Sequence, residues 1–255
     1  MGTRQAVLGT AVAAGLLVLG GCGMFEQNRE TDMEEYGEAI TSLQFDVDSG
    51  DLKVTTGDKT SVKRTIHYGD DLPGATVRVE DGALVLSSCE LRNCSIDYEV
   101  VVPEGTTVNG QLDSGSADLG GIGEVNLQAS SGDITLRDVD GAANVTVDSG
   151  TISADGVDGP ATLSASSGDV TARNIAGATQ VNSDSGTVTV SLTKPESVRV
   201  QASSGDIDVT VPRGSYAVTT ETDSGDVTND LGQATSGTYQ IDLQADSGNI
   251  TIGQS

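Results

Sequence analysis

Apolar and polar residues alternate along most of the chain from residue 39 to the C-terminus. In residues 131–148, Ile134 and Leu136 are separated by a polar residue, and so are Val145 and Val147. A period of two places apolar side chains on one face of a β-strand. No window of the sequence shows the 3.6-residue period of an amphipathic helix. The pattern therefore predicts an all-β protein built from short strands, each with one buried face.

The dipeptide Ser-Gly recurs at a nearly constant interval. From Ser114 onward, with Ser236-Gly237 left aside, its spacing is 17, 18, 18, 18, 19, 20 and 23 residues. A fixed period of this length is typical of stacked units, each too small to bury its own apolar face. We predict that residues 113–255 form a β-solenoid of about 18-residue coils, with two strands and two turns per coil. The positions expected to face inward include Val145, Val147, Leu163, Val181 and Val188.

Residues 39–112 are less regular but also alternate, and Asp81-Gly82 is typical of a tight hairpin turn. We expect this region to be an N-terminal β cap that covers the first coil and protects its edge. The cap and the solenoid would form one continuous folded domain over residues 39–255. Near the C-terminus, Tyr239, Ile241 and Leu243 are expected in the closing strand.

The first residues resemble an export signal. An apolar stretch from Ala6 to Leu19 is too short for a comfortable membrane span but suits a signal-peptide core. It ends in Leu19-Gly20-Gly21-Cys22, which resembles the lipobox of bacterial lipoproteins. The resemblance implies that residues 1–21 are a signal peptide and that Cys22 receives a lipid. An ordinary cleaved signal, with Cys22 unmodified, is the alternative.

A lipid on Cys22 would hold an exported protein at the outer face of the cell membrane, because two or more acyl chains give stable anchoring. Residues 22–38 are polar and acidic without an apolar period, so we expect a flexible tether there. The formal net charge of the chain is −25. Such a chain should not bind nucleic acid, which requires clustered Lys and Arg, and its field should attract cationic partners.

A family resemblance follows from residues 100–105 and the units after them. The segment Val-Val-Val-Pro-Glu-Gly, followed by serial Ser-Gly-Asp-Ile/Val units, resembles the bacterial "putative adhesin" domain over residues 39–252. The resemblance implies a β-solenoid in the cell envelope and provides no catalytic residues. We therefore expect a non-enzymatic, adhesin-like binding or scaffolding module without a cofactor. Its partner would be an envelope or extracellular protein or glycan, and the module itself is expected to be a monomer.

Few residues are candidates for chemistry. His67 is the one histidine of the chain, and its position in a strand predicts a solvent-facing side chain. Cys89 and Cys94 flank four residues at the end of one strand and the start of the next. In an oxidising compartment this spacing favours a disulfide that closes a tight hairpin. A zinc site would need two further ligands, and none is evident.

The aspartates at the Ser-Gly corners show a regular pattern. In six successive coils from residue 113 to residue 206, each corner carries one Asp, alternately before and after Ser-Gly. We interpret these residues as turn formers that accept backbone N–H bonds and that are spaced to limit repulsion. The Gly-Gly-rich loops of calcium-binding β-rolls are missing. We therefore expect no metal site; the weak candidates are the corners with two aspartates, Asp48 with Asp51 and Asp223 with Asp226.

Two other functions are compatible with the sequence. Some β-helices act on polysaccharides through paired carboxylates, so an envelope polysaccharide-acting enzyme is one alternative. Capture of cationic peptides or metal ions by the acidic surface is another.

Overall fold

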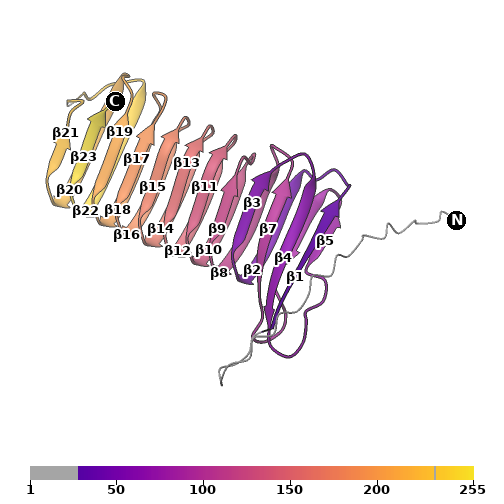
Figure 1. The fold of residues 1–255 in the computed structure, drawn as a ribbon. Coiled ribbons are helices and arrows are strands. Elements are labelled where there is room, and N and C mark those ends of the chain that lie inside the picture. Colours follow the sequence, from indigo (N-terminus) through magenta and orange to yellow (C-terminus); the bar gives the residue numbers. More distant parts are fainter. Residues whose placement is uncertain (1–27, 233) are drawn as a thin grey trace.

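The alternating strands form two long sheets that face each other across an apolar core. The structure is a computed structural model that describes residues 28–232 and 234–255, and none of these residues is helical. Stacked coils give the molecule an elongated shape, with β1 near one end and β20 to β23 at the other (Figure 1). The predicted all-β solenoid is confirmed.

We name the two sheets A and B. Sheet A has twelve strands, in the spatial order β1 (Asn28–Tyr36), β4 (Thr60–Tyr68), β7 (Ser95–Val102), β3 (Leu52–Thr56), β9 (Ala117–Gly120), β11 (Ile134–Val139), β13 (Ile152–Val157), β15 (Val170–Ile175), β17 (Val188–Leu192), β19 (Ile207–Val211), β23 (Ile250–Gln254) and β21 (Val227–Asn229). Sheet B has eleven, in the order β20 (Tyr216–Ser224), β22 (Tyr239–Ser247), β18 (Val198–Ser204), β16 (Thr179–Ser185), β14 (Ala161–Ser167), β12 (Ala143–Ser149), β10 (Val125–Ser131), β8 (Thr107–Ser114), β2 (Ser42–Ser49), β6 (Ala83–Ser87) and β5 (Val77–Glu80).

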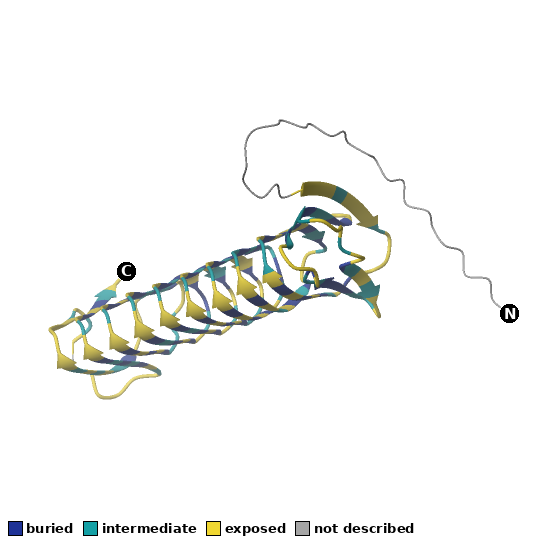
Figure 2. Cartoon of the chain, turned by 90° about the horizontal axis from the view of Figure 1, so that it is seen from below, coloured by how far each residue is buried: buried dark blue, intermediate teal, exposed yellow. Residues whose placement is uncertain are grey.

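Each coil contributes one strand to each sheet, and successive coils pair in parallel. The register places equivalent residues side by side, so Val145 of β12 pairs with Leu163 of β14, which pairs with Val181 of β16. These three residues are fully or almost fully buried, as are Val147 and Val188. All five predicted inward positions are thus confirmed, and the buried residues follow the inside of the solenoid (Figure 2). Apolar ladders along the stack replace the single compact core of a globular domain.

The Ser-Gly corners stack so closely that only glycine fits. Gly132 has φ of +135°, and a Cβ on it would lie 1.6 Å from the carbonyl oxygen of Gly115 in the preceding coil. The Gly132 N–H in turn donates to the Ser149 carbonyl oxygen of the next coil at 2.9 Å. The repeated glycine is therefore required by backbone conformation and by close backbone contact.

The N-terminal region differs from the predicted cap in one respect. Strands β2 and β3 form a regular coil of their own, because Ser49 pairs with Ser114 in the same register that links all later corners. Strand β8 also crosses the expected boundary between residues 112 and 113. The boundary was wrong: the solenoid begins with β2, and residues 57–106 are inserted between its first two coils. Ser49 and Ser114 are 65 residues apart in the chain, far from the period of about 18, so the sequence did not reveal the first coil.

The inserted residues close the end of the solenoid. Strand β4 pairs antiparallel with β7, while β5 and β6 form an antiparallel hairpin at the edge of sheet B. The hairpin turns at Asp81 (φ 49°) and Gly82 (φ 81°), as predicted from the Asp-Gly dipeptide.

Strand β1 lies where we expected a flexible tether, so that prediction was wrong for residues 28–36. All nine residues of β1 pair antiparallel with β4. Its side chains are mostly exposed, and the strand is held by the backbone ladder and by an ion pair between Asp32 and Arg64. A polar strand at a sheet edge needs no apolar period, which is why its sequence resembles a tether. Residues 1–27, including the signal segment and Cys22, lie outside the described residues.

The last two coils stack in reverse chain order. Strand β22 lies between β18 and β20, and β23 lies between β19 and β21. After β18 and β19 the chain therefore leaves one coil position empty and forms the terminal coil with β20 and β21. It then returns, and β22 and β23 fill the empty position. The expectation that Tyr239, Ile241 and Leu243 form the closing strand was wrong, because β22 is the penultimate strand of sheet B. No helix among the described residues is long and apolar enough to span a membrane.

Candidate functional site

The outer face of sheet B carries two continuous columns of polar side chains. Alternate residues of each strand point outward, and the parallel register aligns them from coil to coil. One column contains Gln44, Asn109, Asn126, Asn144, Thr162, Gln180, Arg199, Asp242 and Thr219. The other contains Asp46, Gln111, Gln128, Thr146, Ser164, Asn182, Gln201, Gln244 and Glu221. We call this surface the polar face.

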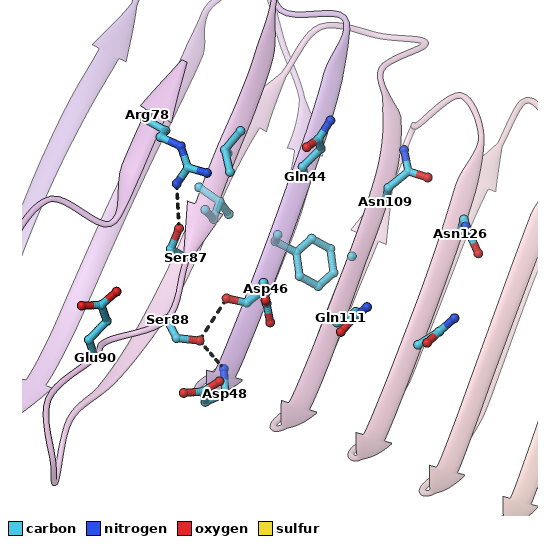
Figure 3. Close-up of a pocket in the computed structure, with 15 residues that line it drawn as sticks. Gln44, Asp46, Asp48, Arg78, Ser87, Ser88, Glu90, Asn109, Gln111 and Asn126 are labelled. Carbon is cyan, nitrogen blue, oxygen red and sulfur yellow. Dashed lines mark hydrogen bonds between the residues drawn. The ribbon is translucent and has the colours of Figure 1, made fainter. Parts of the chain in front are cut away.

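The polar face is hollowed near its N-terminal end into an open groove of about 610 Å³ (Figure 3). The groove crosses five neighbouring strands of sheet B, from β10 through β8, β2 and β6 to β5. Its floor includes Phe45, whose ring packs against Gly110; a Cβ there would lie 2.4 Å from the ring. Figure 3 labels ten polar lining residues: Gln44, Asp46, Asp48, Arg78, Ser87, Ser88, Glu90, Asn109, Gln111 and Asn126. Gln128 also lines the groove.

One end of the groove is held by side-chain hydrogen bonds. The Ser88 hydroxyl donates to the Asp46 carbonyl oxygen at 2.9 Å and accepts the Asp48 N–H at 2.7 Å. Arg78 donates to Glu80 at 2.8 Å and to the Ser87 hydroxyl at 3.0 Å. These bonds attach the segment after β6 to β2 and neutralise the one cationic side chain of the groove.

Cys89 and Cys94 form a disulfide with their Cα atoms 5.9 Å apart. The bridge was expected within a hairpin, but β6 belongs to sheet B and β7 to sheet A, so it closes a corner between the sheets. Glu90, a lining residue of the groove, lies inside this small covalent loop. The disulfide therefore limits where the Glu90 carboxylate can be placed.

The corner aspartates form a column of their own. In spatial order, the residues that follow Ser-Gly are Asp51, Ser116, Asp133, Thr151, Asp169, Thr187, Asp206, Asn249 and Asp226. The carboxylates of Asp133 and Asp169 each accept the backbone N–H of the next residue in the column at 2.8 Å. These aspartates thus accept hydrogen bonds from the neighbouring coil, in agreement with their predicted structural role.

The weak metal candidates lie at opposite ends of the solenoid. Asp48 and Asp51 belong to the first coil, and Asp223 and Asp226 belong to the terminal one. Asp51 Oδ1 accepts hydrogen bonds from the backbone N–H and hydroxyl of Ser116, at 3.0 and 2.7 Å. Among the described residues, no group of three or more His, Cys, Asp or Glu side chains is arranged to hold a metal ion.

His67 does not point into open solvent as expected. Its side chain is 29% exposed, and its Nε2 lies 3.2 Å from Oδ2 of Asp97. The pairing of β4 with β7 brings the two residues together, a contact that no local pattern indicates. The other carboxylate oxygen of Asp97 accepts the N–H of Asp51, so Asp97 extends the corner column into the cap.

A partly buried polar network beside the groove was missed by sequence reasoning. Arg64 Nε donates to Asp32 at 2.9 Å, and Arg64 Nη1 donates to Thr76 Oγ1 at 3.0 Å. The Tyr98 hydroxyl lies 2.7 Å from the same Thr76 oxygen and donates to the Ser87 carbonyl oxygen at 2.8 Å. Burial raises the pKa of Tyr98 to about 12. The network joins both sheets and holds the strand that carries Ser87 at the groove.

This architecture defines an end-capped β-solenoid with two mostly parallel sheets and a polar outer face. The chain belongs to the Toastrack family, DUF4097, whose model matches residues 37–253. No curated protein has a matching sequence.

A solved bacterial structure shares the fold. A "putative adhesin" from Bacteroides fragilis is 16% identical, covers 88% of this chain and 97% of its own, and has a TM-score of 0.52. Another from Parabacteroides distasonis is 11% identical and covers 89% of this chain and 98% of its own, with a TM-score of 0.44. At 16% identity the likeness to the Bacteroides fragilis structure supports the fold alone.

Proposed function

We propose that this protein is a non-catalytic, adhesin-like binding module, displayed outside the cell by a lipid on Cys22. The observation that carries the proposal is the polar face, where two columns of amide, hydroxyl and carboxylate groups extend over nine coils. Polar groups on a rigid backbone favour recognition of an extended partner, because little backbone conformational entropy is lost on binding. The name of the Bacteroides fragilis structure, "putative adhesin", and the family assignment agree with this class of function.

The position of β1 supports a surface display. Cys22 precedes β1 by a few residues, and β1 lies at the opposite end of the solenoid from the terminal coil (Figure 1). A lipid on Cys22 would hold the capped end near the membrane, and the remaining coils would extend outward. The net charge of −25 favours this orientation, since anionic headgroups repel the acidic coils.

The test follows the full chain in a bacterium that processes lipoproteins. We expect the wild-type protein in the membrane fraction with a lipid mass on its N-terminal peptide. Cys22→Ala should release a soluble form or accumulate the unprocessed precursor, whereas Cys89→Ala, a matched cysteine control, should leave the protein in membranes. Wild-type protein recovered from the medium without lipid would contradict the anchor. The purified wild-type protein and the soluble Cys22→Ala form should both bind envelope material. If neither binds, the binding function is contradicted.

The alternative of an enzyme acting on polysaccharide has weaker support. Aspartates of the corner column accept backbone N–H bonds from the next coil, a role in fold stability. The groove does contain the Asp46, Asp48 and Glu90 carboxylates, so binding tests should also monitor cleavage of the sugar. Capture of metal ions has no supporting cluster among the described residues.

A further inference from the structure

Side-chain amides are concentrated at the groove end of the polar face, where they fill five of the six column positions of β2, β8 and β10. Near the C-terminal end, Gln201 Nε2 donates to Gln244 at 3.1 Å, and Asn182 lies in hydrogen-bond range of Ser164. Like Asn144 and Gln180 farther along the face, five exposed side-chain amides in the groove make no hydrogen bond with any other described residue. They are Gln44, Asn109, Gln111, Asn126 and Gln128. Each offers a carbonyl acceptor and an NH₂ donor to a ligand.

These amides form rows that run along the solenoid axis. Gln44, Asn109 and Asn126 are direct neighbours in successive strands, as are Gln111 and Gln128. Neighbouring strands are about 4.8 Å apart, whereas an extended peptide rises about 3.4 Å per residue. A peptide lying along the rows would therefore drift out of register with them. One pyranose unit of a linear polysaccharide has nearly the length of one coil, so its hydroxyls would meet one amide pair per sugar.

The charges of the groove add a second requirement. The side-chain carboxylates of Asp46, Asp48 and Glu90 face the groove, and none of them pairs with a cation among the described residues. Arg78, the one cationic lining residue, is already paired with Glu80. With a formal charge of −25 on the chain, the groove should repel uronate, sulfate or phosphate groups. It should attract ammonium groups.

We propose that the groove binds a linear polysaccharide that carries free amino groups, with the sugar chain lying along the solenoid axis. Hydroxyls of successive sugars bond to the two rows of amides, and ammonium groups bond to Asp46, Asp48 and Glu90. Charge-assisted bonds of this kind are about twice as strong as neutral ones. The inference rests on the proposed binding function and names the chemistry of its ligand.

The experiment uses the full chain in detergent and titrates it calorimetrically, at mildly acidic pH, with two β-1,4-linked hexasaccharides. One is the glucosamine hexamer, and the other is its fully N-acetylated form, which has the same length and no charge. We expect the glucosamine hexamer to bind at least about tenfold more tightly, a difference of about 1.4 kcal/mol. Salt should reduce the difference by screening. Equal binding of the two sugars would overturn the proposal.

Matched variants locate the site. Asp46→Asn with Asp48→Asn should remove most of the preference for the amine. Asp148→Asn with Asp184→Asn makes the same change in net charge at exposed corners outside the groove and should leave binding within about twofold. The double variant Asn109→Ala with Asn126→Ala should weaken the binding of both sugars. If that variant unfolds, Gln111→Ala with Gln128→Ala should weaken the binding of both sugars in the same way. An equal effect of the corner control would show bulk charge attraction and overturn the proposal.

A hexalysine peptide tests whether the groove binds basic peptides instead of sugars. It should bind more weakly than the glucosamine hexamer and should be insensitive to Asn109→Ala with Asn126→Ala. A peptide that binds more tightly and depends on these amides would assign the groove to basic peptides and overturn the proposal. Release of shorter sugars would overturn the non-catalytic assignment. Binding to envelope material without binding to the glucosamine hexamer would refute this inference and leave the proposed function intact.

Discussion

Asp206 and Asn249 are hydrogen-bonded neighbours in the corner column although 43 residues separate them in the chain. Oδ1 of Asp206 accepts the Asn249 backbone N–H at 2.8 Å and its side-chain NH₂ at 3.2 Å. Oδ1 of Asn249 then accepts the N–H of Asp226 at 3.0 Å. The reversed order of the last coils therefore places an uncharged residue between two aspartates. In chain order, Asp226 would have been stacked directly on Asp206.

The interior of the terminal coil agrees with this arrangement. Thr220 and Thr222 occupy the inward positions that pair with Leu243 and Ala245 of β22. Both threonines are only partly buried at the open end of the stack, whereas Leu243 and Ala245 are buried. If β20 followed β18 directly, these hydroxyls would lie between two apolar layers, which is unfavourable without hydrogen-bond partners. Charge spacing and core polarity thus favour the same order.

We predict that Asn249→Asp destabilises the protein. It would place three carboxylates in consecutive coils, and two unit charges about 4.8 Å apart repel by about 0.9 kcal/mol even at the dielectric constant of water. With two such neighbours, the free energy of unfolding should fall by about 2 kcal/mol, and added salt should restore part of it. Thermal melting at low and high salt measures the effect.

Asn249→Ser is the control for that experiment. It keeps the backbone N–H and a small polar side chain, so its melting temperature should remain closer to that of the wild type. In the middle of the stack, Thr151→Asp combined with Ser166→Asp would also place carboxylates in consecutive coils, so this variant should be destabilised for the same reason. A wild-type protein that needs millimolar calcium to fold would contradict the charge-spacing role.

The core ladders give a second prediction. Val147→Asp would bury an unpaired carboxylate inside the solenoid and should cost several kcal/mol of unfolding free energy, about 4 kcal/mol. Thr146→Asp adds the same charge on the exposed face of the same strand and should change stability by less than about 1 kcal/mol. Chemical denaturation compares the two variants. Equal losses would contradict the facing derived from the register.

The disulfide gives a third prediction. Its loop is short, with a sequence separation of 5, so the chain-entropy relation gives a stabilisation of about 2 kcal/mol. Cys89→Ser with Cys94→Ser should lower the unfolding free energy by this amount and loosen Glu90 at the groove. Mass spectrometry of exported protein should find both thiols protected from alkylation until a reductant is added. Free thiols before reduction would contradict the bridge.

The buried Tyr98 predicts a loss of stability at alkaline pH. Its pKa is raised to about 12 in the folded state, whereas an unfolded tyrosine titrates near the ordinary value of 10.0. The tyrosine of the unfolded state therefore loses its hydroxyl proton first. The free energy of unfolding falls as pH rises from 10 toward 12, by about 3 kcal/mol for this group. Below pH 10 both states keep the proton, and Tyr98 causes no loss of stability.

Tyr98→Phe isolates that contribution. The variant loses the hydrogen bond to the Ser87 carbonyl oxygen and should be less stable at neutral pH, by about 1 kcal/mol. Its stability should then fall less steeply than that of the wild type between pH 10 and 12. Urea unfolding at several alkaline pH values checks this. Parallel pH profiles would show that Tyr98 does not carry the effect.

Local patterns were sufficient to predict the repetitive part of the fold. The period of two and the Ser-Gly interval predicted strands, corners and inward residues such as Val145 and Leu163, because each coil repeats the same local physical constraints. The Asp-Gly turn at residues 81 and 82 was predictable for the same reason: its backbone conformation depends on those two residues. The acidic corners, too, were recognisable as an alternating row.

Contacts between distant segments decided the rest. The pairing of β1 with β4, the contact of His67 with Asp97 and the reversed order of β20 and β22 all depend on which strands meet, and strand pairing has no local signature. The groove is a further case. Gln44, Asn109 and Asn126 are ordinary outward polar residues of three separate strands, and the insertion of residues 57–106 hides their common period. Only the parallel register brings these amides into one row, because backbone hydrogen bonds align whole strands and not single residues.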